Sequence, residues 1–229
     1  MSLSPSLSPP PISSAEGVPL LPQKPKIRGV IHQWAALGAL AMGIVFVLCA
    51  PIPKAAWGAG IFAASLTVLF LVSAVYHRVN WKPEARQWMR RADHASIFVL
   101  IAGTYTPIAM LALPEALGAK VLWVAWGGAL LGIAQSLCWI KAPKAVAALL
   151  ALLVGWSIVP YLSELKEGLG EVNWWLVLAG GIAYTLGAIA YASKRPRLSP
   201  RWFGYHEVFH ALTVVAASLH AAALWRLMC

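Results

Sequence analysis

The sequence contains few charged side chains and very few acidic ones. Asp, Glu, Lys and Arg make up 11% of its 229 residues, only 8 residues are acidic, and 60% are hydrophobic, with a mean hydropathy of +0.71. A water-soluble domain of this size needs far more polar surface than this composition supplies. The sequence therefore predicts an integral membrane protein and excludes an ordinary soluble domain.

Cysteine is also scarce and has no paired spacing. Cys49, Cys138 and Cys229 are scattered along the chain, and no two of them form a Cys-x-x-Cys motif. Such spacing predicts neither a disulfide framework nor a metal site built from thiolates.

Residues 1–28 differ in composition from the rest of the chain. They are rich in Ser and Pro and have no hydrophobic period, which predicts a disordered or polyproline-like arm. The arm lacks a basic segment followed directly by an apolar one, so we do not expect a cleavable signal peptide. The predicted domains are this cytoplasmic arm, 1–28, and a membrane domain, 29–229.

The membrane domain contains seven apolar stretches close to the length of about 20 residues that crosses a bilayer. The fifth has the least definite boundary because it contains Pro160. We predict an all-α fold, a seven-transmembrane helix bundle. The stretches are Ile31–Ala50, Ala56–His77, Asp93–Leu113, Val121–Ile140, Ala145–Ser163, Trp174–Ala192 and Tyr205–Trp225.

Basic residues indicate the orientation of the bundle. Fourteen of the 18 Lys and Arg residues fall in the N-terminal arm and the second, fourth and sixth loops. The positive-inside rule then places the N-terminus in the cytoplasm and the C-terminus outside, in a multi-pass protein of the cell (inner or plasma) membrane. Topology thus explains the net charge of +10 without a nucleic-acid partner, and the expected partners are membrane lipids.

Three histidines and an aspartate fall at the cytoplasmic ends of the predicted segments. His77 closes the second segment, Asp93 opens the third, and His206 and His210 begin the seventh. His206 and His210 are four residues apart and therefore share one helical face. Polar groups at this depth normally face the bundle interior, so we expect these side chains to meet.

Three imidazoles and a water form a tetrahedral zinc site of the open kind, in which the metal lowers the pKa of the water to about 7. We therefore predict Zn2+ bound by His77, His206 and His210. Asp93 is the predicted base beside the metal-bound water. Ser73, one turn before His77, is predicted to hydrogen-bond to that water or to a carbonyl oxygen. His32 is interpreted as an interfacial polar residue.

His206–His210 also matches the His-Glu-x-x-His motif of zinc proteases, in which Glu acts as general base. No acidic residue follows Glu207 to serve as a third ligand, so we favour a flanking role for Glu207. His220 lies on the same helical face, roughly 20 Å beyond His206, and is too far away to join the same metal. It is interpreted as a buried polar contact or part of a deeper cavity.

Together these motifs resemble the bacterial hemolysin III proteins, which belong to the progestin and adipoQ receptor family with the adiponectin receptors. The motifs are Ser73-Ala-Val-Tyr-His77, Asp93-His94, Ile101-Ala-Gly-Thr-Tyr-Thr-Pro107, His206-Glu-Val-Phe-His210 and Ser218-Leu-His220. The resemblance implies seven helices, a cytoplasmic N-terminus and zinc bound by the three matched histidines, with Asp93 and Ser73 beside the metal water.

The wider group of membrane hydrolases around this family includes alkaline ceramidases, and the resemblance therefore implies hydrolysis of a ceramide-like or acyl-amide lipid. Two alternatives stay open. One is a receptor or membrane-homeostasis protein in which zinc is structural, with His94 or Asp93 completing the coordination. The other is a membrane-permeabilising hemolysin or channel.

Overall fold

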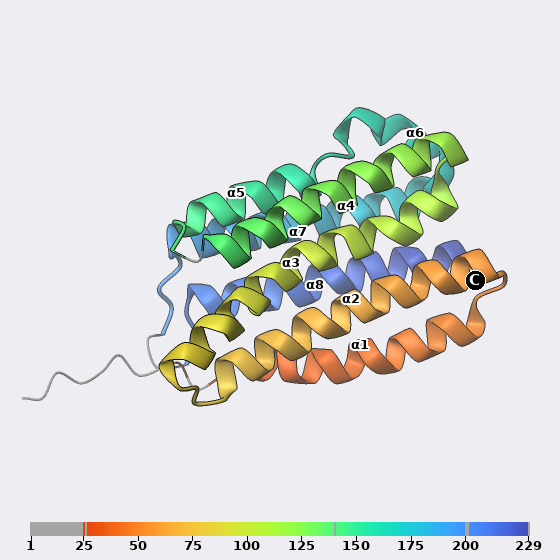
Figure 1. Cartoon of the computed structure of the whole chain (residues 1–229). Coiled ribbons are helices and arrows are strands. Elements are labelled where there is room, and N and C mark those ends of the chain that lie inside the picture. The colour runs from red at the N-terminus through yellow and green to blue at the C-terminus, as the bar shows by residue number, and fades with distance from the viewer. Residues whose placement is uncertain (1–24, 26, 140, 200–201, 229) are drawn as a thin grey trace, which may run out of the picture.

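The described part of the chain is built from helices. A computed structural model describes residues 25, 27–139, 141–199 and 202–228, so the predicted arm lies almost entirely outside the described residues. Figure 1 shows the long helices running side by side. The elements are α1 (Val30–Cys49), α2 (Pro53–Arg78), α3 (Pro83–Ala112), α4 (Glu115–Cys138), α5 (Lys144–Gly155), the 3₁₀ helix η1 (Val159–Tyr161), α6 (Leu162–Leu169), α7 (Glu171–Ser193) and α8 (Tyr205–Met228).

In the described part of the chain, seven helical segments are long and apolar enough to cross a membrane, which confirms the predicted fold class and segment number. Six are single helices, and the fifth, Lys144–Leu169, consists of α5, η1 and α6. Its helix is interrupted after Gly155, and Pro160 lies in the 3₁₀ turn. The start of α1 and the end of α8 lie at opposite ends of the bundle (Figure 1). The side of the membrane that each end faces stays a prediction.

The third span begins earlier than predicted. Helix α3 starts at Pro83, whereas the predicted segment began at Asp93. The error has a physical cause, because hydropathy detects the part of a helix in hydrocarbon and misses the charged turns that continue it into the interface. Asp93 therefore lies about 15 Å inside α3 from its first residue and does not open the helix.

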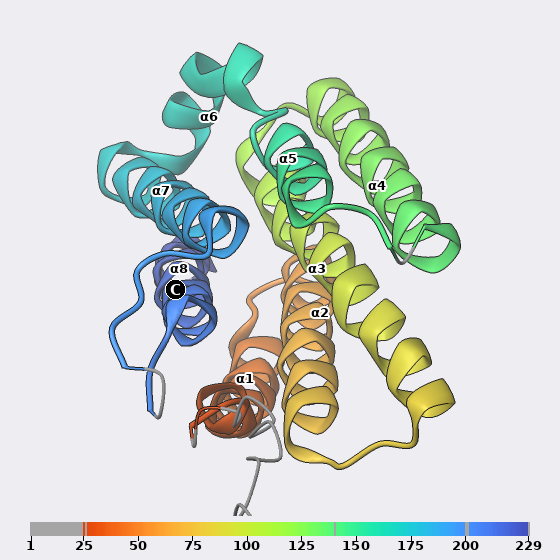
Figure 2. The same ribbon diagram turned by 90° about the vertical axis from the view of Figure 1, so that its left-hand side faces the viewer.

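The seven spans follow one another around a closed ring. Successive spans pack together from α1 to α4, α5 packs on α4 and α7, and α7 packs on α8, which returns to α1. The view along the bundle in Figure 2 shows this order, with α3 near the middle. Because α3 also contacts α5 and α8, its side chains can reach the interior from a central position.

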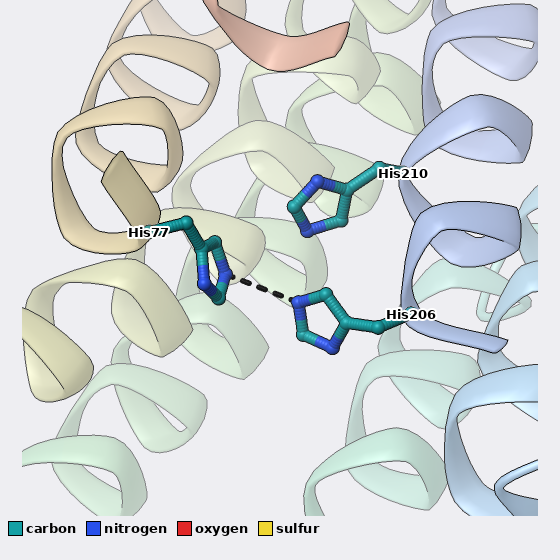
Figure 3. A group of neighbouring side chains, drawn as sticks. All are labelled: His77, His206 and His210. Atoms are coloured by element: carbon teal, nitrogen blue, oxygen red, sulfur yellow. Dashed lines mark hydrogen bonds between the residues drawn. The ribbon is translucent and has the colours of Figure 1, made fainter. Parts of the chain in front are cut away.

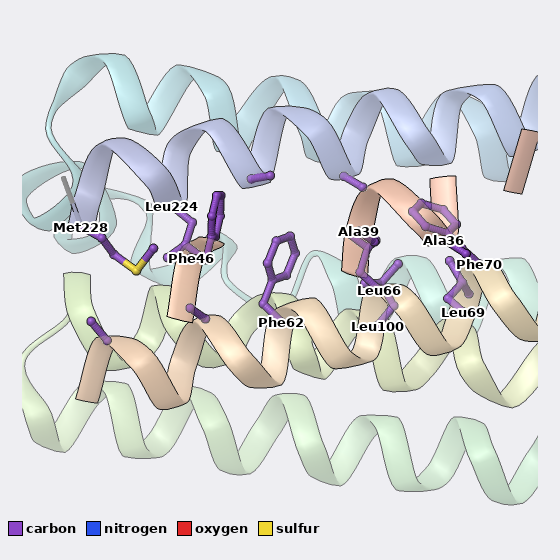
Figure 4. Packing of buried hydrophobic residues seen from close by; sticks show 14 residues of the cluster. Ala36, Ala39, Phe46, Phe62, Leu66, Leu69, Phe70, Leu100, Leu224 and Met228 are labelled. Carbon is purple, nitrogen blue, oxygen red and sulfur yellow. The ribbon is translucent and has the colours of Figure 1, made fainter. Parts of the chain in front are cut away.

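Apolar side chains on α1, α2, α3 and α8 form the main core. Figure 4 shows Phe62, Leu66 and Phe70 of α2 beside Leu100 of α3 and Leu224 of α8. The outer face is apolar too, and large side chains such as Trp57 and Trp123 are exposed on it. A helix that is apolar on all sides is typical of a membrane span, where hydrocarbon replaces water as the outer solvent.

Candidate metal centre

Two helices bring three histidines together at the end of the bundle where α1 begins. His77 comes from the last turn of α2, and His206 and His210 come from the first turns of α8. One ring nitrogen from each lies within 4.8 Å of the other two. Figure 3 shows His77 facing the two α8 rings across the gap between the helices. The structure thus brings together the three residues predicted as metal ligands.

The donor set fits a metal ion. His77 Nε2 and His206 Nε2 are 3.0 Å apart (Figure 3). Ligand nitrogens of a tetrahedral zinc site, each about 2.0–2.1 Å from the metal, are about 3.3 Å from one another. The three rings therefore need only small movements to bind one ion, and imidazole suits zinc as well as other transition metals.

The two other predicted site residues lie close to this group. Ser73 is buried one turn before His77, and Asp93 is partly buried on α3. Both side chains line the same cavity as His206 and His210. Among the described residues the metal group contains the three histidines and no carboxylate.

A long cavity extends from this group through the bundle. Its volume is about 190 Å³, and Ser73, Asp93, His206 and His210 line one end. Leu113, which also lines it, is 20 residues after Asp93 in sequence, so the cavity follows about 30 Å of α3. This distance equals the thickness of the hydrocarbon core of a bilayer. Between its ends the lining is mostly Leu, Ile, Val, Ala and aromatic side chains.

The interpretation of His32 as an interfacial residue is wrong. His32 is 2% exposed, lines the same cavity, and stacks on His210 with the ring centroids 3.8 Å apart. Neither of its ring nitrogens has a hydrogen-bond partner among the described residues. The rule that polar groups in a membrane span face the bundle interior, applied to His77, could also have found His32.

Glu207 is buried but points to a different partner. It is 1% exposed, forms an ion pair with Arg28, and accepts a hydrogen bond of 2.8 Å from the Gly204 amide. The second contact is half of a capping box, in which a side chain in the first turn reaches back to the start of its helix. These contacts stabilise the start of α8 and leave Glu207 poorly placed to act as a general base.

The turn before α1 lies directly against the end of α2. Gly29 has a φ of 80°, and a Cβ atom there would lie 3.0 Å from His77 Cβ and 3.3 Å from the Ala74 carbonyl oxygen. Only glycine adopts this conformation at low cost and leaves room for such contact. The sequence before the first span thereby helps to position His77.

The remaining histidines line the cavity without joining the metal group. His94 Nε2 is 3.5 Å from the Tyr191 hydroxyl near the three-histidine end. His220 lies deeper, where its Nε2 is 3.0 Å from the Val177 carbonyl oxygen. The prediction that His220 cannot share the metal agrees with this placement, and the deeper cavity considered for it exists.

Comparison with known proteins gives a consistent result. The family model described as haemolysin-III related matches residues 21–221. The hemolysin-3 homolog of Bacillus subtilis (strain 168) is 30% identical over 154 residues, or 67% of this chain and 69% of that protein. Hemolysin-3 of Bacillus cereus is 32% identical, over 57% of this chain and 59% of its own length. The human monocyte to macrophage differentiation factor is 27% identical, over 73% of this chain and 69% of its own length.

Proposed function

Because the chain belongs to the haemolysin-III related family of multi-pass membrane proteins, we propose that its three-histidine group binds zinc and serves the hydrolysis of lipid amide bonds. The observation that carries this proposal is the position of the group. His206 and His210 line the polar end of a long apolar cavity together with the Asp93 carboxyl group, and His77 faces His206 across the group.

The cavity suits a lipid with one long chain. Its apolar lining takes up an acyl chain with the favourable free energy of apolar burial, about 0.8 kcal/mol for each methylene group. The end near Asp93 combines a carboxyl group with metal-competent histidines, so the polar linkage of the lipid is proposed to bind there. In the proposed complex an acyl carbonyl lies beside the three histidines, and the rest of the lipid chain lies inside the bundle.

His77, His206 and His210 would hold the metal. Bound zinc supplies Lewis-acid polarisation of an acyl carbonyl and a lowered pKa of water. Asp93 accepts the proton of the attacking water and returns it to the leaving amine nitrogen, as a C–O bond forms and the C–N bond breaks. The Ser73 hydroxyl, which lines the same end of the cavity, is proposed to hydrogen-bond to the attacking water or to the acyl carbonyl oxygen. The products are a fatty acid and an amine.

A purely structural metal is the second candidate. Structural zinc sites are closed by four protein ligands, whereas catalytic sites keep one position open. The described residues group three ligands here, which favours the catalytic interpretation. The third candidate, a membrane-permeabilising protein, has support from the names of the two Bacillus relatives. The apolar lining of the cavity does not suit the passage of ions.

Metal analysis combined with an amide-cleavage assay tests the proposal. We expect purified wild-type protein to bind about one zinc per chain and to cleave a long-chain acyl amide such as a ceramide. Asp93→Asn should retain zinc and lose at least about 100-fold in turnover, as expected when a general base is removed. His210→Ala should lose both the bound zinc and the turnover.

Two results would contradict the proposal in different ways. Wild-type protein without affinity for zinc would remove the metal site itself. Zinc bound without turnover of any ceramide or simple acyl amide would favour the structural candidate.

A further inference from the structure

The cavity contains a second polar place, far from the three histidines. His220 follows His210 by ten residues on α8, which places it about 15 Å further along the bundle. Its ring centroid is 5.7 Å from that of Tyr184 on α7. Both side chains line the cavity, among mostly apolar neighbours.

The contact of His220 with α7 determines which nitrogen carries the proton. His220 Nε2 is 3.0 Å from the Val177 carbonyl oxygen. A carbonyl only accepts, so Nε2 is the donor and Nδ1 is left as an acceptor in the neutral ring. Gly180 makes this approach possible, because a Cβ atom there would lie 2.3 Å from His220 Nε2. His220 is 8% exposed, and its Nδ1 has no partner among the described residues.

The hydroxyl group of Tyr184 is also buried without a hydrogen-bond partner in the described part of the chain. Leaving such a group unpaired costs free energy, and buried polar groups are normally satisfied. Other hydroxyls in the bundle follow that rule. Tyr105, which lines the same cavity, donates a hydrogen bond of 2.8 Å to the Gly155 carbonyl. The unpaired acceptor of His220 and the unpaired hydroxyl of Tyr184 therefore point to a missing partner.

We propose that His220 and Tyr184 form a polar subsite that binds a hydroxyl group carried on the lipid chain, about 15 Å along the bundle from His210. The subsite rests on the proposed function in one respect, since it assumes that the cavity holds a lipid chain. A hydroxyl group suits both residues, because it donates to His220 Nδ1 and accepts from the Tyr184 O–H. A keto group only accepts and would leave His220 Nδ1 unpaired.

The spacing predicts where the hydroxyl lies on the chain. An extended carbon chain, with bonds of about 1.5 Å, advances about 1.3 Å per bond. A distance of about 15 Å from the metal-binding end then corresponds to roughly the tenth to fourteenth carbon. A hydroxyl near the head of the chain would instead lie among the three histidines.

Binding of free fatty acids tests the subsite without any chemistry. Octadecanoic acid and its 12-hydroxy and 2-hydroxy derivatives would be titrated into the purified full chain in detergent. Two added hydrogen bonds should make the mid-chain hydroxy acid bind about tenfold more tightly than octadecanoic acid. Tyr184→Phe should largely remove this preference without lowering the thermal unfolding temperature, because the lost hydroxyl has no partner among the described residues.

Tyr105→Phe is the matched control. It removes a hydroxyl from the same cavity, but that hydroxyl is bonded to the Gly155 carbonyl. We expect a lower unfolding temperature and an unchanged preference for the hydroxy acid. Equal affinities for the three acids, binding of none of them, or a preference that survives Tyr184→Phe would overturn the subsite.

The result is separable from the proposed hydrolysis. The acids have no amide bond, and the ratio of their affinities should persist in His210→Ala, which lacks a metal ligand. Absence of amide turnover with a retained preference would contradict the hydrolase alone. Turnover of lipid amides without a preference for the mid-chain hydroxyl would contradict the subsite alone.

Discussion

The imidazole ring of His32 stacks on that of His210, with ring centroids 3.8 Å apart and planes inclined by 4°. This contact joins α1 to α8 directly behind a candidate metal ligand. His32 also contacts Phe70 of α2. The ring of His210 is thereby confined between its own helix and α1, which limits the directions in which its nitrogens can point.

Loss of the stacked ring should weaken metal binding. In His32→Ala, His210 gains rotational freedom, and we expect zinc affinity to fall about tenfold, a magnitude typical of contacts that orient ligands. His32→Phe keeps a planar ring, so its zinc affinity should fall less than that of His32→Ala. Competition with a zinc-binding dye measures both. Unchanged affinity in His32→Ala would mean that the stack does not orient His210.

Glu207→Gln should affect stability and spare the metal centre. The substitution removes the charge that pairs with Arg28, and we expect the free energy of unfolding to fall by about 1–2 kcal/mol. The lower value is expected because 23% of the Arg28 side chain is exposed, and solvent weakens the ion pair. Exposed Glu167→Gln is the control and should be nearly neutral. Chemical denaturation gives the free energies. If Glu207→Gln instead kept its zinc and fold but lost all turnover, Glu207 would be a general base after all.

Gly29→Ala should disturb the end of α2. The left-handed backbone costs a residue with a Cβ atom about 1–2 kcal/mol, and the new methyl group would lie 3.0 Å from His77 Cβ. We expect a lower unfolding temperature together with weaker zinc binding. Gly38→Ala, within α1, has no atom within 4 Å of the new methyl group and should be neutral or stabilising. Similar effects of the two variants would contradict the proposed role of Gly29.

Acid should release the metal. Zinc binds neutral imidazoles, so protons compete for all three histidines and the stability contributed by the metal is lost as the pH falls. We expect metal content to drop steeply between about pH 7 and pH 5, the range in which free histidine becomes protonated. Metal analysis after dialysis at each pH measures the release, and circular dichroism establishes whether the helices persist. Full retention of zinc at about pH 5 would argue against a site of three histidines.

Local sequence properties predict most of this fold. The seven spans follow from apolar length alone, and the i,i+4 spacing of His206 and His210 places both rings on one face. Alternation of the spans then brings His77 to the same end of the bundle. Two regularities, helix period and membrane crossing, are therefore enough to assemble the three histidines.

Contacts between distant segments are harder to predict. The stack of His32 on His210 and the ion pair of Arg28 with Glu207 depend on how α1 packs against α8. The closure of the ring of spans determines that packing, and no period in the sequence encodes it. Hydropathy likewise misplaced the start of α3, because the charged turns before Asp93 are helical but not apolar.

The three-histidine group also has a consequence for how the protein is made. His77 and His206 are 129 residues apart, and four of the seven spans lie between them. Chains are synthesised from the N-terminus, so His77 enters the membrane long before α8 exists. A nascent chain that stops short of Tyr205 carries one of the three histidines and cannot hold the ion. The proposed metal loading would therefore be a late event in biogenesis, and a bound ion would distinguish chains whose final helix has docked.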